Sequence, residues 1–123
     1  PVLRENIQEK QGDWLLLISK TSWGESHGKL GPLLLESFFQ SLVSLEIPPA
    51  AIFFFNEGVL LGTDRSSVIF QSLLRLERQG IELGFCGASL DYFQLKRELY
   101  IGKMISVNTI AERISRCSRV VSL

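Results

Sequence analysis

The sequence predicts an α/β protein, a three-layer α/β/α sandwich around a mainly parallel, five-stranded sheet. Short apolar runs of strand length alternate with segments of helical period along the 123 residues. Such alternation builds βαβ units with right-handed crossovers. The runs are continuously apolar, as strands are when helices cover both faces of a sheet. Hydrophobic residues make up 46% of the chain, enough for one core. We therefore expect a single domain over residues 1–123, with residues 1–13 as a polar lead-in.

The first strand and the first helix are expected in the N-terminal third. Residues 14–19 (WLLLIS) form a continuous apolar run, which predicts a strand buried on both faces. A helix should follow, because apolar residues then recur every four positions and stack on one helical face: Leu30, Leu34, Phe38 and Leu42. Pro32 fits the first turn of this helix, where its missing N–H costs nothing, and Pro48-Pro49 prevents continuation.

The second strand and the turn after it are expected over residues 51–62. Ile and Phe in the run AIFFF at 51–55 favour a packed strand. The turn NEGVLLG follows, and we expect Gly58 and Gly62 to use positive φ angles there. Thr63 or Asp64 then offers a side-chain oxygen that can cap the next helix.

A second helix leads into the third strand. Ile69, Leu73 and Leu76 share one stripe of this helix, and Gly80 stands where a helix commonly ends in a left-handed residue. The run IELGFC at 81–86 predicts the strand. Sites in parallel α/β sheets gather at the carboxyl ends of the strands. The loops that follow the three predicted strands are therefore the places to look for function.

The last third of the chain is expected to hold two more helices and two more strands. A turn comes first, and then a short helix with Ser89 or Asp91 as its cap. A short strand is predicted over 100–104, followed by a helix that Ser106 caps and a closing strand over 119–123.

The composition excludes several classes of function. Lys and Arg number 13, and so do Asp and Glu, so the basic excess of a nucleic-acid-binding protein is absent. Cys86 and Cys117 cannot build a disulfide scaffold and suit a reducing compartment. The polar N-terminal stretch lacks the apolar region of a signal peptide, and the apolar runs elsewhere are too short to cross a bilayer. We therefore expect a cytoplasmic protein that binds neither nucleic acid nor membrane.

Cys86 is the strongest candidate for chemistry. It ends the third predicted strand and opens the loop CGASLD, close to the expected start of a helix. Unpaired backbone N–H groups at a helix start favour an anion, and therefore the thiolate that nucleophilic sulfur chemistry needs. Gly87 would let the backbone approach the sulfur or a ligand closely. The alternative is a buried cysteine that packs as a small hydrophobic residue.

The loop after the first strand holds a second group of candidates. Thr21, Ser22 and Gly24 resemble a turn that cradles phosphate, although an ordinary solvated loop has the same composition. His27 is the only histidine, so we expect neither a metal site nor a cofactor. It could still pair in space with Cys86.

Five further residues draw attention by their positions. Asn56 builds the turn after the second strand, and Glu57 beside it faces either a cleft or the solvent. Asp91 is expected to cap a helix rather than to act as an acid. An exposed Trp23 would mark an interface, with burial against the sheet edge as the alternative. Cys117 lies near the end of the last helix, where a thiolate is disfavoured, so a packing role is expected.

Three stretches of the sequence carry a resemblance to a known family: FFFNEGVLLG, LLRLERQGIELGFCGASLDYF and IGKMISVNTIAERISRCSRVVSL. The first contains an Asn-x-Gly-Val-x-Leu pattern, and the second a long helix, a glycine, a strand, then Cys-Gly and Leu-Asp. The matching residues are Asn56, Gly58, Val59, Leu61, Gly80, Cys86, Gly87, Leu90 and Asp91. From about Trp14 onward the chain resembles the DsrE-like family, specifically the DsrE-like C-terminal domain of YedF-type, sulfurtransferase-like selenium-metabolism proteins.

This resemblance implies both an architecture and an activity. The fold would be the five-stranded, parallel DsrEFH-like sandwich, assembled as a homo-oligomer or with related subunits. The activity would be sulfur relay, in which Cys86 carries sulfane sulfur as a persulfide. The sulfur would come from a donor such as a TusA-like protein and would then be passed on.

One departure from the family narrows the chemistry. Relatives of the YedF type often show Cys-Gly-Thr-Cys, whereas this sequence has Cys86-Gly87-Ala88-Ser89. Because Ser89 can neither resolve a persulfide nor close a disulfide, only carriage on one thiol remains. Two other functions stay open, a small-anion or nucleotide-binding module that uses the loop after the first strand, and an inactive structural subunit of an oligomer.

Overall fold

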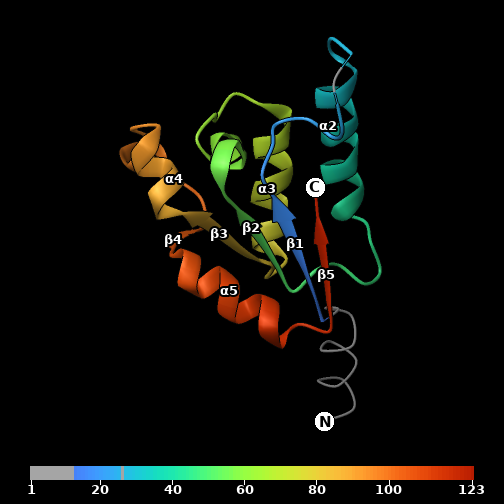
Figure 1. Ribbon diagram of the computed structural model, residues 1–123. Coiled ribbons are helices and arrows are strands. Elements are labelled where there is room, and N and C mark those ends of the chain that lie inside the picture. The colour runs from blue at the N-terminus through green and yellow to red at the C-terminus, as the bar shows by residue number, and fades with distance from the viewer. Residues whose placement is uncertain (1–12, 26) are drawn as a thin grey trace.

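The computed structural model describes residues 13–25 and 27–123, so the expected polar lead-in lies outside the described residues except for Asp13. The elements follow one another as the sequence predicts (Figure 1). In chain order they are β1 (Trp14–Ile18), α2 (Leu30–Leu42), β2 (Ala51–Phe54), the 3₁₀ helix η1 (Asn56–Gly62), α3 (Val68–Arg78), β3 (Glu82–Cys86), α4 (Gly87–Tyr92), the 3₁₀ helix η2 (Lys96–Glu98), β4 (Lys103–Ile105), α5 (Val107–Arg116) and β5 (Arg119–Ser122).

The five strands form one parallel sheet in the order β4-β3-β2-β1-β5. β1 and β2 are buried along their whole length, as continuous apolar runs predict. β5 returns to the edge beside β1, where Trp14 pairs with Arg119. The expected α/β class and its mainly parallel, five-stranded sheet are confirmed.

Two neighbouring phenylalanines show how helices cover both faces of the sheet. Phe54 lies between Phe39 of α2 and Phe85 of β3, with ring centroids 6.2 and 4.4 Å away. The next residue back, Phe53, points to the opposite face, where the Arg113 guanidinium of α5 lies 5.2 Å from its ring centroid. α2 and α3 therefore pack on one side of the sheet and α5 on the other (Figure 1), which completes the three layers.

α2 turns a different stripe to the sheet from the one that its four-residue spacing indicates. Leu35, Phe39 and Leu42 are buried, whereas Leu30 and Leu34 are 52% and 43% exposed. The helix is apolar on two adjacent stripes, and the spacing alone does not say which one faces the core.

The turn after β2 corrects the expectation for its two glycines. Gly58 and Gly62 lie in η1 without positive φ angles, and Asn56 is the residue there with a left-handed φ of 52°. A β-carbon on Gly58 would stand 2.2 Å from the Ile18 carbonyl oxygen, and one on Gly62 would stand 2.2 Å from the Phe85 ring. Both positions require glycine because the chain is crowded there, rather than because of backbone conformation.

Two predicted helix caps are wrong and one is confirmed. Ser67, rather than Thr63 or Asp64, caps α3 by accepting from the Phe70 N–H. The helix after β3 begins directly at Gly87, so Ser89 and Asp91 lie inside α4 and do not cap it. Ser106 caps α5 as expected by accepting from the Thr109 N–H.

Candidate functional site

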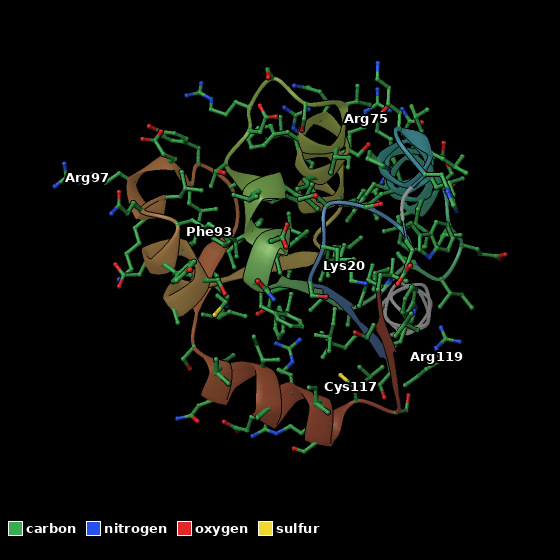
Figure 2. All side chains as sticks on the ribbon, turned by 45° about the horizontal axis from the view of Figure 1, so that its top comes forward. Lys20, Arg75, Phe93, Arg97, Cys117 and Arg119 are labelled. Carbon is green, nitrogen blue, oxygen red and sulfur yellow. The ribbon has the colours of Figure 1, made fainter. Side chains whose placement is uncertain are left out.

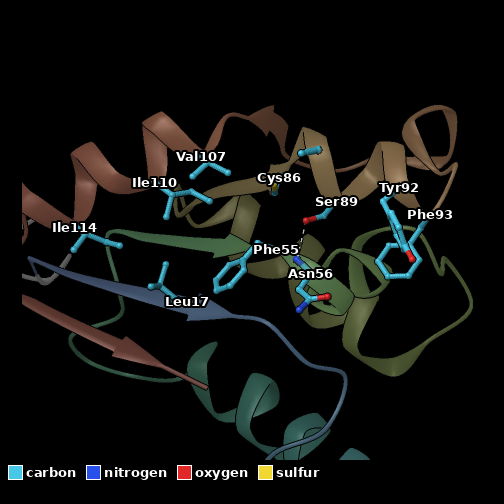
Figure 3. A pocket seen from close by; sticks show the side chains of 11 residues that line it. Leu17, Phe55, Asn56, Cys86, Ser89, Tyr92, Phe93, Val107, Ile110 and Ile114 are labelled. Atoms are coloured by element: carbon cyan, nitrogen blue, oxygen red, sulfur yellow. Dashed lines mark hydrogen bonds between the residues drawn. The ribbon is translucent and has the colours of Figure 1, made fainter.

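An apolar pocket of about 430 Å³ opens at the carboxyl ends of β2 and β3, between the sheet and α5 (Figure 3). Pockets in parallel α/β sheets are expected at this edge. The walls come from β1, the end of β2 and η1, the end of β3 and α4, and one side of α5. The lining residues are Leu17, Phe55, Asn56, Cys86, Ala88, Ser89, Tyr92, Phe93, Val107, Ile110 and Ile114.

Cys86 is the last residue of β3 and stands in the wall of this pocket (Figure 3). Side chains alternate along a strand, so Cys86 and Gly84 face the same side of the sheet. A β-carbon on Gly84 would lie 2.7 Å from both Phe53 and Ile105, and glycine is therefore needed for the packing beneath the pocket. The Cys86 side chain is only 3% exposed, which makes the pocket its route to a reactant.

A hydrogen bond joins the two loops that flank Cys86. The backbone N–H of Asn56 donates to the Ser89 hydroxyl oxygen at 2.8 Å, across the ends of β2 and β3 (Figure 3). Because the Ser89 oxygen accepts this bond, its own O–H is free to donate to a ligand. Asn56 and Ser89 thus supply the polar part of an otherwise apolar pocket.

α5 covers the pocket with an apolar side made by Val107, Ile110 and Ile114. Their spacing of three and four residues puts them on one helical face. Figure 3 shows these side chains pointing from α5 toward Leu17 and Phe55 on the sheet. Ile110 is buried, whereas Val107 at 61% and Ile114 at 42% exposed form part of the mouth.

Ion pairs to Glu82 anchor the same helix to the sheet. Glu82 at the start of β3 binds Arg113 of α5 at 2.8 Å and Lys103 of β4 at 3.1 Å. Burial acts to raise the pKa of Glu82, but hydrogen bonds and positive charge from Arg113 and Lys103 outweigh burial. The pKa of Glu82 is therefore lower than its ordinary value of 4.5.

The loop after β1 does not reach the pocket. Thr21, Ser22 and Gly24 lead toward α2, and none of them lines the pocket. The Ser22 hydroxyl donates to the Gly24 carbonyl oxygen at 3.4 Å, and the Trp23 N–H donates to Gly31 at the start of α2. These groups are used in a local turn. His27 is exposed in the same loop and does not line the pocket either.

The other predicted site residues, Asp91, Gly87 and Gly58, and the neighbouring Glu57 do not line the pocket. Asp91 is exposed, and its carboxylate lies 3.7 Å from the Lys96 ammonium. Glu57 is exposed as well. A β-carbon on Gly87 would meet nothing closer than 3.7 Å, so the site does not need glycine there for space. Gly58 acts at a distance, by letting η1 pack on the Ile18 carbonyl.

No described basic side chain reaches Cys86 through the pocket. Lys20, Lys29 and Lys96 do not line the pocket, and no described Lys or Arg side chain does. The apolar lining is not among the residues predicted from the sequence: it consists of Leu17, Phe55, Phe93 and the face of α5. The period of α5 shows an apolar face, but only the fold reveals that it meets the ends of β2 and β3.

Cys117 stands apart from this site. It follows the last turn of α5, at the opposite end of the helix from Val107, where the chain enters β5 beside Arg119 (Figure 2). It is half-buried and does not line the pocket. The protein therefore carries its own comparison for the reactivity of Cys86.

Comparisons with known proteins bear on the fold. No protein-family model matches the chain, and no curated protein does. Among solved structures it is similar to the ychN protein from E. coli, with a TM-score of 0.63 and 14% identity over 92% of this chain and 99% of that chain. No helix of the described residues is long and apolar enough to cross a membrane. The chain thus shares its fold with the ychN protein, and its α/β class is the one that the sequence predicts.

Proposed function

We propose that this protein is a sulfur-relay protein related to the YedF type, and that Cys86 carries sulfane sulfur as a persulfide. One observation carries the proposal: the Cys86 side chain ends a central strand and stands in the wall of an open pocket. A nucleophilic cysteine must be reachable by a reactant, and the pocket gives Cys86 that access. The DsrE-like fold, which the sequence resemblance associates with sulfur relay, agrees with it.

The chemical step needs only one thiol. The Cys86 thiolate attacks the sulfane sulfur of a donor persulfide, and a new S–S bond forms at Sγ. The S–S bond of the donor breaks, and its electron pair leaves with the donor thiolate. Sulfane sulfur moves with no net oxidation, so no second cysteine is required. The absence of a thiol at Ser89 therefore does not prevent carriage.

The fold suggests how a donor and an acceptor would reach the sulfur. The mouth of the pocket is bordered by Tyr92, Val107 and Ile114, which are 82%, 61% and 42% exposed. The expected donor is a TusA-like protein of the cytoplasm, presenting its persulfide at this mouth. Ser89 and Asn56 would hold the incoming group beside Cys86.

A transfer assay tests this function. We expect the native protein and Cys117→Ser to accept sulfur from a persulfide-loaded TusA-like protein, and Cys86→Ser to accept none. Circular dichroism of Cys86→Ser checks that the fold is retained. Loading of Cys86→Ser at the native rate would exclude Cys86 as the carrier.

A role as a subunit of an assembly is the second candidate, and the outer stripe of α2 favours it. Leu30 and Leu34 are exposed there, and half-buried Phe38 continues the stripe with Trp23 packed 5.0 Å from its ring. Exposed apolar groups gathered on one surface are typical of an interface. Assembly is compatible with sulfur relay, because α2 and the pocket lie on opposite faces of the sheet.

A further inference from the structure

We infer that the small molecule admitted to the Cys86 pocket is uncharged and largely apolar, and that the low-molecular-weight sulfur compounds reacting there are of this class. The inference rests on the proposed function for the sulfur step. The ligand class itself rests on the pocket.

None of the described residues that line the pocket has an ionic side chain at its ordinary charge state other than the titratable Cys86 and Tyr92, and no Asp, Glu, Lys, Arg or His is among them. Eight of the lining residues carry aliphatic or aromatic hydrocarbon side chains or are tyrosine: Leu17, Phe55, Ala88, Tyr92, Phe93, Val107, Ile110 and Ile114. The remaining side-chain groups are the amide of Asn56, the hydroxyl of Ser89 and the thiol of Cys86. An anion that entered would lose its hydration and find no described cation among the lining side chains. Thiosulfate and carboxylate-bearing persulfides are therefore poorly matched to this pocket.

The shape of the pocket fits a small body with one polar end. A volume of about 430 Å³ falls within the range of small-ligand pockets. Ser89, whose O–H is free to donate, and Asn56 stand together next to Cys86, between the aliphatic side of α5 and the ring of Phe93 (Figure 3). A ligand with an apolar body and an uncharged sulfur or oxygen group near Cys86 would match both the apolar walls of the pocket and its polar groups on Ser89 and Asn56.

Sulfur transfer from such a donor to Cys86 requires no oxidant or reductant. An organic hydropersulfide R–S–SH presents its outer sulfur to the Cys86 thiolate. The bond between Cys86 Sγ and the outer sulfur forms as the S–S bond within the donor breaks, and RS⁻ leaves with the electron pair. Cys86–S–SH and one thiolate result, with no net oxidation. When R is apolar, the lining residues contact it.

Two matched donors test the charge preference. Benzyl hydropersulfide and 4-carboxybenzyl hydropersulfide share one reacting group and differ by a remote carboxylate. We expect Cys86 to load at least about tenfold faster from the neutral donor, because the carboxylate loses hydration without gaining a partner. Cys117 lies outside the pocket, so the ratio of its loading rates with the two donors gives their intrinsic relative reactivity. This ratio should be near one. Equal ratios at the two cysteines would overturn the inference while leaving the sulfur-carrier function intact.

A pair of lysine substitutions tests whether the pocket sets the preference. Val107 lines the mouth and is 61% exposed, so Val107→Lys puts a cation there without disturbing the core. Asn108→Lys adds the same charge at the next residue of α5, outside the lining set. We expect Val107→Lys to narrow the preference for the neutral donor several-fold and Asn108→Lys to leave it nearly unchanged. The same ratio in both variants would overturn the inference.

A binding measurement separates this inference from the sulfur chemistry. In Cys86→Ser, which cannot carry sulfur, benzyl methyl sulfide should bind and shift the NMR signals of Val107, Ile110 and Ile114. Its 4-carboxy analogue should bind at least about tenfold more weakly. Tighter binding of the uncharged sulfide would support the ligand class even if no donor loads Cys86. Failure of every donor to load Cys86 would refute only the carrier function. Equal binding of the two, or none, would refute the ligand class. So would conversion of an oligomer to a monomer by Val107→Lys, since a second copy would then close the mouth.

Discussion

At the scale of single residues, the site depends on a few positions where adding or removing one side-chain atom would disrupt a close contact or a hydrogen bond. Gly58 sits against the Ile18 carbonyl and Gly84 against Phe53 and Ile105. Cys86 and Ser89 occur one turn apart around the start of α4, and the hydroxyl of Ser89 holds the Asn56 N–H. The reasons for these residue types differ from those that the sequence suggests. Gly58 is needed for close approach, whereas Gly87 is not.

Two alanine substitutions distinguish these glycines. Gly58→Ala should lower the free energy of unfolding by about 3 kcal/mol, because its β-carbon would meet the Ile18 carbonyl oxygen at 2.2 Å. Gly87→Ala should change stability by less than about 0.5 kcal/mol, since its β-carbon meets nothing closer than 3.7 Å. Urea unfolding at constant pH measures both. Equal losses would mean that η1 can move away from β1 at little cost.

The Asn56–Ser89 hydrogen bond is a second residue-scale feature that can be tested. Ser89→Ala removes the acceptor of the Asn56 N–H, and we expect a stability loss of about 1 kcal/mol. Hydrogen exchange of the Asn56 amide should accelerate, while exchange within β2 and β3 should not. Ser66→Ala, which affects only a bond to Asp64 on the surface, is the control. Unchanged exchange at Asn56 would show that this bond does not hold the wall of the pocket.

At the scale of elements, the pocket exists because α5 is held across the ends of β1 to β3. The apolar side of α5 contacts the pocket, while Arg113 reaches down to Glu82. Lys103 of β4 reaches the same carboxylate, so one acidic group links β3, β4 and α5. The boundaries of α4 and β4 differ from the predicted ones by a few residues. Local propensity does not fix the residue at which β3 ends and α4 begins.

The Glu82 pairs should make stability depend on pH. Because the pKa of Glu82 is lowered in the folded state, the pairs stabilise the fold above its ordinary pKa of 4.5. Their contribution is lost as the pH falls through the folded pKa. Glu82→Gln should therefore cost about 1 kcal/mol at pH 7 and almost nothing near pH 2. Urea unfolding across this range measures the difference.

A control variant separates this contribution from general charge effects. Glu112 pairs with Arg116 within α5, and both side chains are well exposed. Glu112→Gln should change the pH profile much less than Glu82→Gln does. Parallel profiles for the two variants would mean that Glu82 has no special role in anchoring α5.

At the scale of the whole molecule, the sheet separates two surfaces with different properties. One face carries α5 and the Cys86 pocket, and the other carries α2 with its exposed outer stripe. The fold class, the order of the strands along the chain and the position of Cys86 at the end of β3 could be predicted from the sequence, because continuous apolar runs and helical periods are local signals. The lining of the pocket and the buried side of α2 could not, since two apolar stripes on one helix satisfy the same periodicity. Only packing on Phe54 decides that Phe39 faces inward.

The outer stripe of α2 leads to a prediction about assembly. If it forms an interface, the double variant Leu30→Lys/Leu34→Lys should convert an oligomer into a monomer, because two buried lysines would lose hydration. Val68→Lys changes an equally exposed apolar residue at the start of α3 and should leave the assembly intact. Light scattering measures the mass. An unchanged mass in the double variant would remove α2 from the interface.

The central claim, that Cys86 is a sulfur carrier, is tested most directly by locating sulfur in the native protein. The reduced protein is incubated with a persulfide donor, free thiols are blocked, and peptides are examined by mass spectrometry. The account predicts one added sulfur on the peptide that contains Cys86 and none on the peptide that contains Cys117, because only Cys86 lines the pocket. Equal loading of both cysteines, or loading of neither, would contradict it.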